Sequence, residues 1–125
     1  MKILLSIVLT FYIFTSCDCS DVDQMSIAES MVPDSVNITD TVKVSIKAEA
    51  YNGCWGDLHV KLFHNDDFRY SIKAYAKKSC YSFACPAVMV QLDTTLKIVP
   101  SKKGLYFVQV WESPNRYSID SLIVK

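Results

Sequence analysis

Three cysteines in the second half of the chain could form a disulfide or ligate a metal ion. Cys54 stands alone, whereas Cys80 and Cys85 are separated by four residues. This spacing is loose for a zinc site, so a disulfide is the better interpretation. We expect Cys54 to pair with Cys85 or with Cys80, with Cys85 favoured, and we expect no metal ion and no cofactor.

Aromatic residues flank these cysteines. Loops that are rich in aromatics and joined by a disulfide favour a contact surface, because aromatic side chains dominate the binding energy of many interfaces. One interpretation is therefore a carbohydrate- or ligand-binding surface. The other is that Trp55 and Phe83 cap one end of the hydrophobic core. The residues concerned are Tyr51, Trp55, Tyr81 and Phe83.

The remaining chemistry-bearing residues do not indicate an enzyme. His59 and His64 are an odd number of positions apart, which places them on opposite faces of a strand. Asp66 and Asp67 lie in "HNDD", a composition typical of a hairpin turn. We find neither a nucleophile-elbow motif nor a phosphate-binding loop. The 13 basic and 13 acidic residues form no basic block, which argues against nucleic-acid binding.

Alternating hydrophobicity predicts the elements that carry these residues. In residues 41–50, Val42, Val44 and Ile46 share one face, while Lys43 and Ser45 share the other. A period of two indicates a half-buried β-strand. Strands are likewise expected at 26–33, 58–63, 68–76, 88–92, 95–100, 104–111 and 117–125.

The 125 residues are enough for one domain, and half of them are apolar. About seven or eight short strands, with no helical periodicity, are typical of an all-β protein with a single antiparallel β-sandwich. Following the strand directions along the chain places Cys54, Cys80 and Cys85 at the same end of this sandwich.

Two stretches resemble the opening and the penultimate strand of bacterial immunoglobulin-like domains. They are "VPDSVNITDTVKVSI", with its Pro-Asp turn, and "KKGLYFVQVW", with its Gly-x-Tyr start. The resemblance implies an immunoglobulin-like sandwich in which Tyr106 forms a tyrosine corner, hydrogen-bonding back to the chain. No cysteine lies within 104–111, so the inter-sheet disulfide of antibody domains is not expected.

The N-terminus has the pattern of an export signal. Lys2 precedes an apolar run over 3–14, which is too short to span a bilayer. The sequence Phe14-Thr15-Ser16-Cys17 then resembles the lipobox of bacterial lipoproteins. That resemblance implies removal of residues 1–16 and attachment of acyl chains such as palmitate at Cys17, which would hold the protein on a membrane.

Lipidation at Cys17 would also explain the odd number of cysteines, because four would remain to form disulfides in an oxidising compartment. Residues 17–25 read as a lipidated cysteine with an acidic tether, and residues 26–125 as the sandwich. Asp18, Asp21 and Asp23 resemble the signal that sends lipoproteins of Bacteroides-like bacteria to the cell surface. A plain soluble spacer is an equal alternative.

The sequence therefore predicts a lipid-anchored protein of the cell envelope, at the outer membrane or cell surface rather than the inner membrane. Its expected role is non-enzymatic, as a structural or binding module with an envelope protein or glycan as partner. The first alternative is a carbohydrate- or ligand-binding module that uses Trp55, Tyr81 and Phe83. The second is a secreted eukaryotic domain with a glycan at Asn37.

Overall fold

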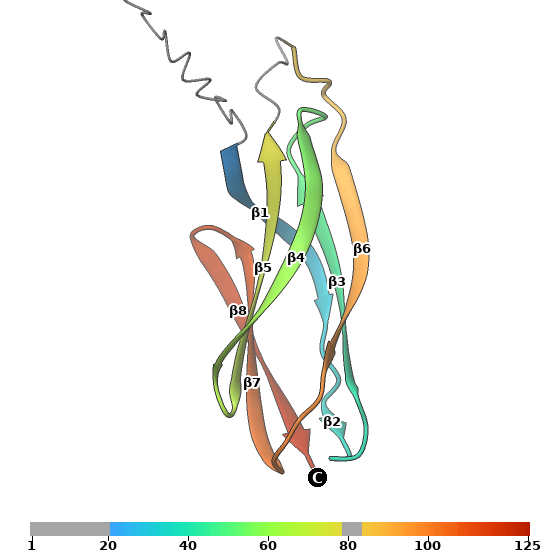
Figure 1. Cartoon of the computed structure of the whole chain (residues 1–125), viewed down its shortest axis with the longest axis vertical. Coiled ribbons are helices and arrows are strands. Elements are labelled where there is room, and N and C mark those ends of the chain that lie inside the picture. The colour runs from blue at the N-terminus through green and yellow to red at the C-terminus, as the bar shows by residue number, and fades with distance from the viewer. Residues whose placement is uncertain (1–20, 79–83) are drawn as a thin grey trace, which may run out of the picture.

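The structure, a computed structural model, describes residues 21–78 and 84–125 (Figure 1). Within these residues the chain forms eight strands and no helix, which confirms the all-β prediction. None of the described residues belongs to a helix that could span a membrane. The strands are β1 (Asp21–Met31), β2 (Ser35–Val36), β3 (Val42–Ala50), β4 (Trp55–Asp66), β5 (Arg69–Lys78), β6 (Val90–Ile98), β7 (Gly104–Ser113) and β8 (Arg116–Val124).

The strands build one curled sheet that folds back on itself as a half-barrel. β3 and β6 make one layer, and β2, β8, β7, β5 and β4 make the other. β1 belongs to both, because its first half pairs with β5 and its second half pairs with β3. The result is an elongated molecule whose layers run along its length (Figure 1).

The expectation of a wholly antiparallel sandwich is not met, because the sheet is mixed. β5 and β7 are parallel neighbours, as are β2 and β8. The chain leaves β5, crosses to the other layer as β6, and returns as β7 in the direction of β5. Hydrophobic alternation reports which face of a strand is buried, but it does not report which strands become neighbours.

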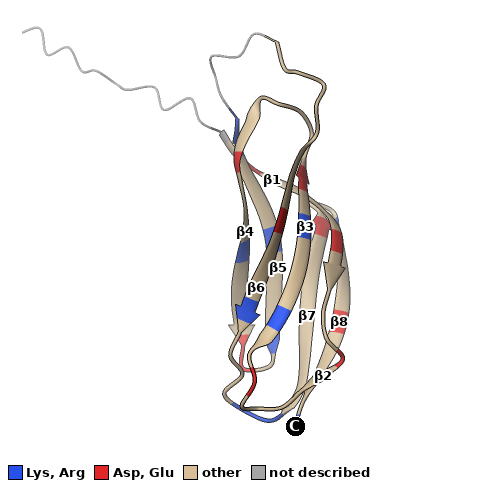
Figure 2. Cartoon of the chain, turned by 90° about the vertical axis from the view of Figure 1, so that its right-hand side faces the viewer, with Lys and Arg blue, Asp and Glu red and all other residues tan. Residues whose placement is uncertain are grey.

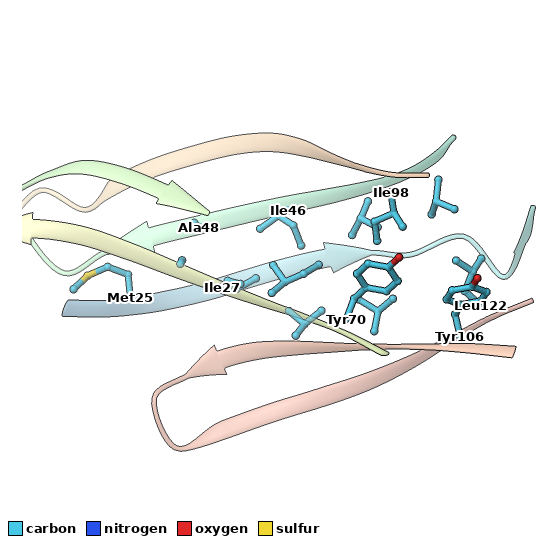
Figure 3. Packing of buried hydrophobic residues seen from close by; sticks show 14 of the residues in the cluster. Met25, Ile27, Ile46, Ala48, Tyr70, Ile98, Tyr106 and Leu122 are labelled. Atoms are coloured by element: carbon cyan, nitrogen blue, oxygen red, sulfur yellow. The ribbon is translucent and has the colours of Figure 1, made fainter. Parts of the chain in front are cut away.

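The core lies between the two layers, where the inward side chains of alternate positions meet (Figure 3). β3 contributes an unbroken alternation of buried and more exposed residues, as its sequence predicts. Burial of these aliphatic and aromatic groups is the main force that holds the layers together. The largest fully buried side chains are Tyr106, Met25, Ile72, Leu122, Val42, Val44, Val108 and Val110.

Two element boundaries differ from the sequence-based expectation. The predicted strands at 88–92 and 95–100 are a single strand, β6, which pairs with β3 over nine consecutive positions. Strand pairing also begins earlier than expected, because residues 21–25 of the expected tether form the first half of β1. Met25 within that segment is fully buried, so its apolar side chain explains why the segment joins the fold.

The turn into β7 is set by glycine and tyrosine. Gly104 has a φ of +148°, a conformation that disfavours other residues, and a Cβ there would lie 3.1 Å from the Phe68 ring. The buried Tyr106 hydroxyl donates a hydrogen bond to the carbonyl of Lys102, at 2.6 Å. This bond is the predicted return contact of Tyr106 to the preceding chain.

Candidate binding surface

The loops after β3 and β5 are joined by a disulfide between Cys54 and Cys85, as the sequence favoured. Their Cα atoms lie 5.0 Å apart. The Gly53 amide also donates to the carbonyl of Pro86 at 3.0 Å. The cysteines are 31 positions apart, and closing a loop of that length contributes about 3–4 kcal/mol in the chain-entropy view. We call residues 51–56 and 84–86 the cystine end.

The aromatic residues of the cystine end divide between the core and solvent. Trp55 is partly buried and packs against the hydrophobic core, as expected for a capping residue. Its ring lies under the Lys78 ammonium, at 5.9 Å. Tyr51 is 56% exposed and meets Trp55 edge-on, with ring centres 6.5 Å apart. Among the described residues of this end, Tyr51 is thus the aromatic residue that is exposed to solvent.

Several predicted site residues lie outside the described residues. Cys17, the expected lipidation site, precedes β1. The loop after β5 contains the remaining ones, which are Cys80, Tyr81 and Phe83.

A second surface, which the sequence-based analysis missed, covers the outside of the layer formed by β4, β5, β7 and β8. Side chains at alternate positions of these strands point away from the core and bring aromatic rings together with lysines. Trp111 packs against Tyr117 with ring centres 5.0 Å apart, and His59 stacks on Tyr75 at 6.1 Å. We call this surface the aromatic face, and its residues are His59, Lys61, Phe63, Lys73, Tyr75, Phe107, Trp111 and Tyr117.

A row of hydrogen-bonded polar side chains crosses the aromatic face. The Asn65 amide donates to the Ser71 hydroxyl, which in turn donates to Gln109 Oε1 at 3.2 Å. Ser71 is buried beneath these neighbours although it lies on the outer side of β5. The three residues come from β4, β5 and β7, so the row fixes those strands relative to one another.

Beside this row lies a hollow of about 480 Å³, a size common among small-molecule sites. Its polar groups are the two amides and an ion pair between Arg69 and Asp66, 3.7 Å apart. Its walls include aromatic rings. The lining residues are Asn65, Asp66, Arg69, Tyr70, Phe107, Gln109, Tyr117 and Ile119.

Aliphatic side chains extend the aromatic face along β7 and β8. Ile119 is 58% exposed, and Leu105 is paired across the strands with Ile123. Exposed apolar patches on a folded domain often mark a site where another molecule binds. The signal was present in the sequence, because in 104–111 apolar residues occupy both alternating sets, whereas a strand with one solvated face has one polar set.

Positions of Lys, Arg, Asp and Glu are distributed along the strands of both layers (Figure 2). At the end of the molecule opposite the cystine end, Lys102 and Asp67 form an exposed ion pair at 2.8 Å. The hydrogen bond from Lys102 lowers the pKa of Asp67 and, reciprocally, raises the pKa of Lys102.

Among the described residues no three His, Cys, Asp or Glu side chains gather closely enough to hold a metal ion.

Comparisons with protein-family models, with curated proteins and with solved structures found no match for this chain. The functional conclusions therefore depend on the residues and their geometry alone.

Proposed function

We propose that the mature chain is a lipid-anchored, non-enzymatic binding module of a bacterial cell envelope, and that it binds its partner through the aromatic face. The observation that carries this proposal is the exposed apolar surface on the outer side of β7 and β8, whose inner side already forms the core. Apolar side chains on the solvent side of a folded domain gain free energy when a partner covers them.

An anchor at Cys17 would leave this surface free. Cys17 is four positions before Asp21, where β1 begins, and four extended residues span at most about 14 Å. β1 begins beside the end of β5, on the same side of the molecule as the cystine end (Figure 1). The lipid would hold that end near the membrane, while the aromatic face extends away from it.

The immunoglobulin-like assignment is part of the proposal. It is supported by the Tyr106 hydrogen bond and by β1, which pairs with both layers. The parallel pairing of β5 with β7 departs from that pattern. The binding role is supported by the aromatic face itself, where amides, lysines and rings offer hydrogen bonds, charge and stacking contacts.

The anchor is tested by fractionation and mass spectrometry of the protein from its native host. We expect the wild type to remain with membranes and to begin at Cys17 with added acyl mass. Cys17→Ser should release the protein or block its processing. A Cys17→Ser variant that matures and fractionates like wild type would contradict the anchor.

The binding surface is tested by a benzoylphenylalanine photocrosslinker placed at Ile119, on the aromatic face, and as a control at Thr95. Thr95 is exposed on the outer side of β6, in the opposite layer. Irradiated host cells should yield a crosslinked species from position 119 but not from position 95. Equal yields, or none from position 119, would rule out the aromatic face as the binding surface.

The cystine end is the second candidate surface, because Tyr51 is exposed there beside Trp55. In this alternative, the expected ligand-binding site would include Trp55 together with Tyr81 and Phe83. Replacing Trp55 with Phe would then remove the fluorescence response to a ligand, whereas the same change at Trp111 would leave it.

A further inference from the structure

Two lysines of the aromatic face stand directly opposite each other. Lys61 of β4 is paired with Lys73 of β5 in the hairpin ladder, and Lys and Arg bands lie at the same height on these strands (Figure 2). Like charges in directly opposed positions destabilise a sheet. Neither lysine forms an ion pair within the described part of the chain.

The nearest carboxylates on β4 do not compensate this charge. Asp57 lies 3.7 Å from the Lys77 ammonium, and Asp66 is paired with Arg69. Both ammonium groups thus lack a carboxylate partner among the described residues, although the whole chain has a net charge of zero. An anion bound between the two ammonium groups would attract both of them and so offset their mutual repulsion.

Aromatic rings hold both ammonium groups against the sheet. Lys61 Nζ lies 5.2 Å from the centre of the Tyr75 ring. Lys73 Nζ lies 5.0 Å from the Trp111 ring and 5.7 Å from the Phe63 ring. Cation–π attraction of this kind limits the freedom of the long side chains to move apart into solvent.

A second pair of lysines also occupies directly opposed positions and serves as a comparison for Lys61 and Lys73. Lys43 of β3 is paired with Lys97 of β6 on the outside of the other layer. No described ring lies over either ammonium group, and neither lysine forms an ion pair among the described residues. Only the pair on the aromatic face combines unneutralised charge with rings.

We propose that this site binds an acidic polysaccharide, one whose sugars carry carboxylate or sulfate groups. An acidic group lies between Lys61 and Lys73, where it accepts charge-assisted hydrogen bonds from both. The ring of a neighbouring sugar packs on Trp111 and Tyr117, because its C–H groups carry partial positive charge that meets the negative face of an aromatic ring. This inference rests on the proposed function and names the class of its ligand.

The adjoining hollow favours a sugar over an acidic peptide. Its lining includes the amide side chains of Asn65 and Gln109 and the rings of Phe107 and Tyr117. Amides and rings in one hollow match the hydroxyl groups and the C–H faces of a pyranose together. An acidic peptide is the competing ligand, and poly-glutamate tests it.

The test is affinity electrophoresis and calorimetry of the full chain with sodium polygalacturonate and with chondroitin sulfate. We expect binding to at least one of them, and a loss of affinity of about tenfold or more in the Lys61→Gln/Lys73→Gln variant, since both charge-assisted hydrogen bonds are removed. The matched control is Lys43→Gln/Lys97→Gln, which should bind like wild type. Thermal unfolding of both variants confirms that they remain folded.

Tryptophan fluorescence locates the contact. Ligand should change the emission of the wild type and of Trp55→Phe, and should leave Trp111→Phe without a response. Loss of the response in Trp55→Phe instead would place the ligand at the cystine end and overturn the inference.

Further outcomes would also overturn it. These are no binding of either acidic polysaccharide, equal binding of neutral dextran, equal binding of poly-glutamate, or unchanged affinity in the Lys61→Gln/Lys73→Gln variant. If the polysaccharides do not bind but Ile119 still crosslinks in cells, the proposed ligand class fails and the binding module stands. If both experiments fail, the proposed function fails as well.

Discussion

The outer surfaces of the two layers differ although their inner surfaces are alike. The outside of β3 and β6 presents serine, threonine, lysine, glutamate, aspartate and glutamine, the usual composition of a solvated strand face. The outside of β7 and β8 presents mostly phenylalanine, tryptophan, tyrosine, leucine and isoleucine, with Gln109 and Ser121 as polar members. Because both layers pack on one core, stability does not require this difference, and it is the difference that the proposed binding role predicts.

The largest expected effect compares an inward and an outward isoleucine of the same layer. Ile72 is fully buried, so Ile72→Ala should lower the free energy of unfolding by about 2–5 kcal/mol. Ile119 is exposed, and Ile119→Ala should change it by no more than about 0.5 kcal/mol. Denaturant unfolding measures both. A similar loss in the two variants would mean that the aromatic face is part of the core.

The next effect compares a serine on each outer surface. Ser71→Ala removes the hydroxyl that joins Asn65 to Gln109, and we expect a loss of about 1 kcal/mol in the free energy of unfolding. Ser45 is exposed on β3 and has no such partners among the described contacts, so Ser45→Ala should be nearly neutral. Chemical denaturation at neutral pH distinguishes them. If both are neutral, the polar row does not hold the strands.

A smaller effect separates the two lysine pairs. Lys43→Glu turns repulsion with Lys97 into attraction and should raise the free energy of unfolding by about 0.2–1 kcal/mol at low salt. Lys61→Glu makes the same change opposite Lys73 but also loses the contact with the Tyr75 ring, which contributes about 0.5–1 kcal/mol. The free energy of unfolding should therefore rise less in Lys61→Glu than in Lys43→Glu. Equal gains would show that the rings do not hold the lysines.

The smallest effect concerns Tyr70, at the border between the core and the hollow. Burial raises the pKa of Tyr70, because the phenolate is disfavoured away from water. Its folded pKa is above the unfolded value, so stability is lost as pH rises past about 10. Tyr70→Phe should therefore lose less stability between neutral and alkaline pH than the wild type does. Denaturant unfolding at several pH values measures this difference. An unchanged alkaline decline in the variant would contradict this origin.

The all-β fold and the strand faces could be predicted because a half-buried strand repeats every two residues. The alternation of Val44 and Ile46 with polar neighbours specified the inner side of β3 without knowledge of its partners. The direction of consecutive strands brought Cys54 to the same end as Cys80 and Cys85, and the structure pairs it with the favoured Cys85. Such inferences require only the relation between residues or strands that are close together in the sequence.

The aromatic face shows where this approach stops. The turn at Asp67 and Phe68 is local, but the register that opposes Lys61 and Lys73 also depends on a register shift between His64 and Asp66. The position of Trp111 beside Lys73 is different, because it needs the parallel pairing of β5 with β7 across the excursion of β6 into the other layer. The sequence by itself determined the outward side chains of a strand such as β3, in which one alternating set is polar, since periodicity is a property of each strand. Only the tertiary structure decided which outward side chains meet, since strand order depends on packing between segments far apart in the chain.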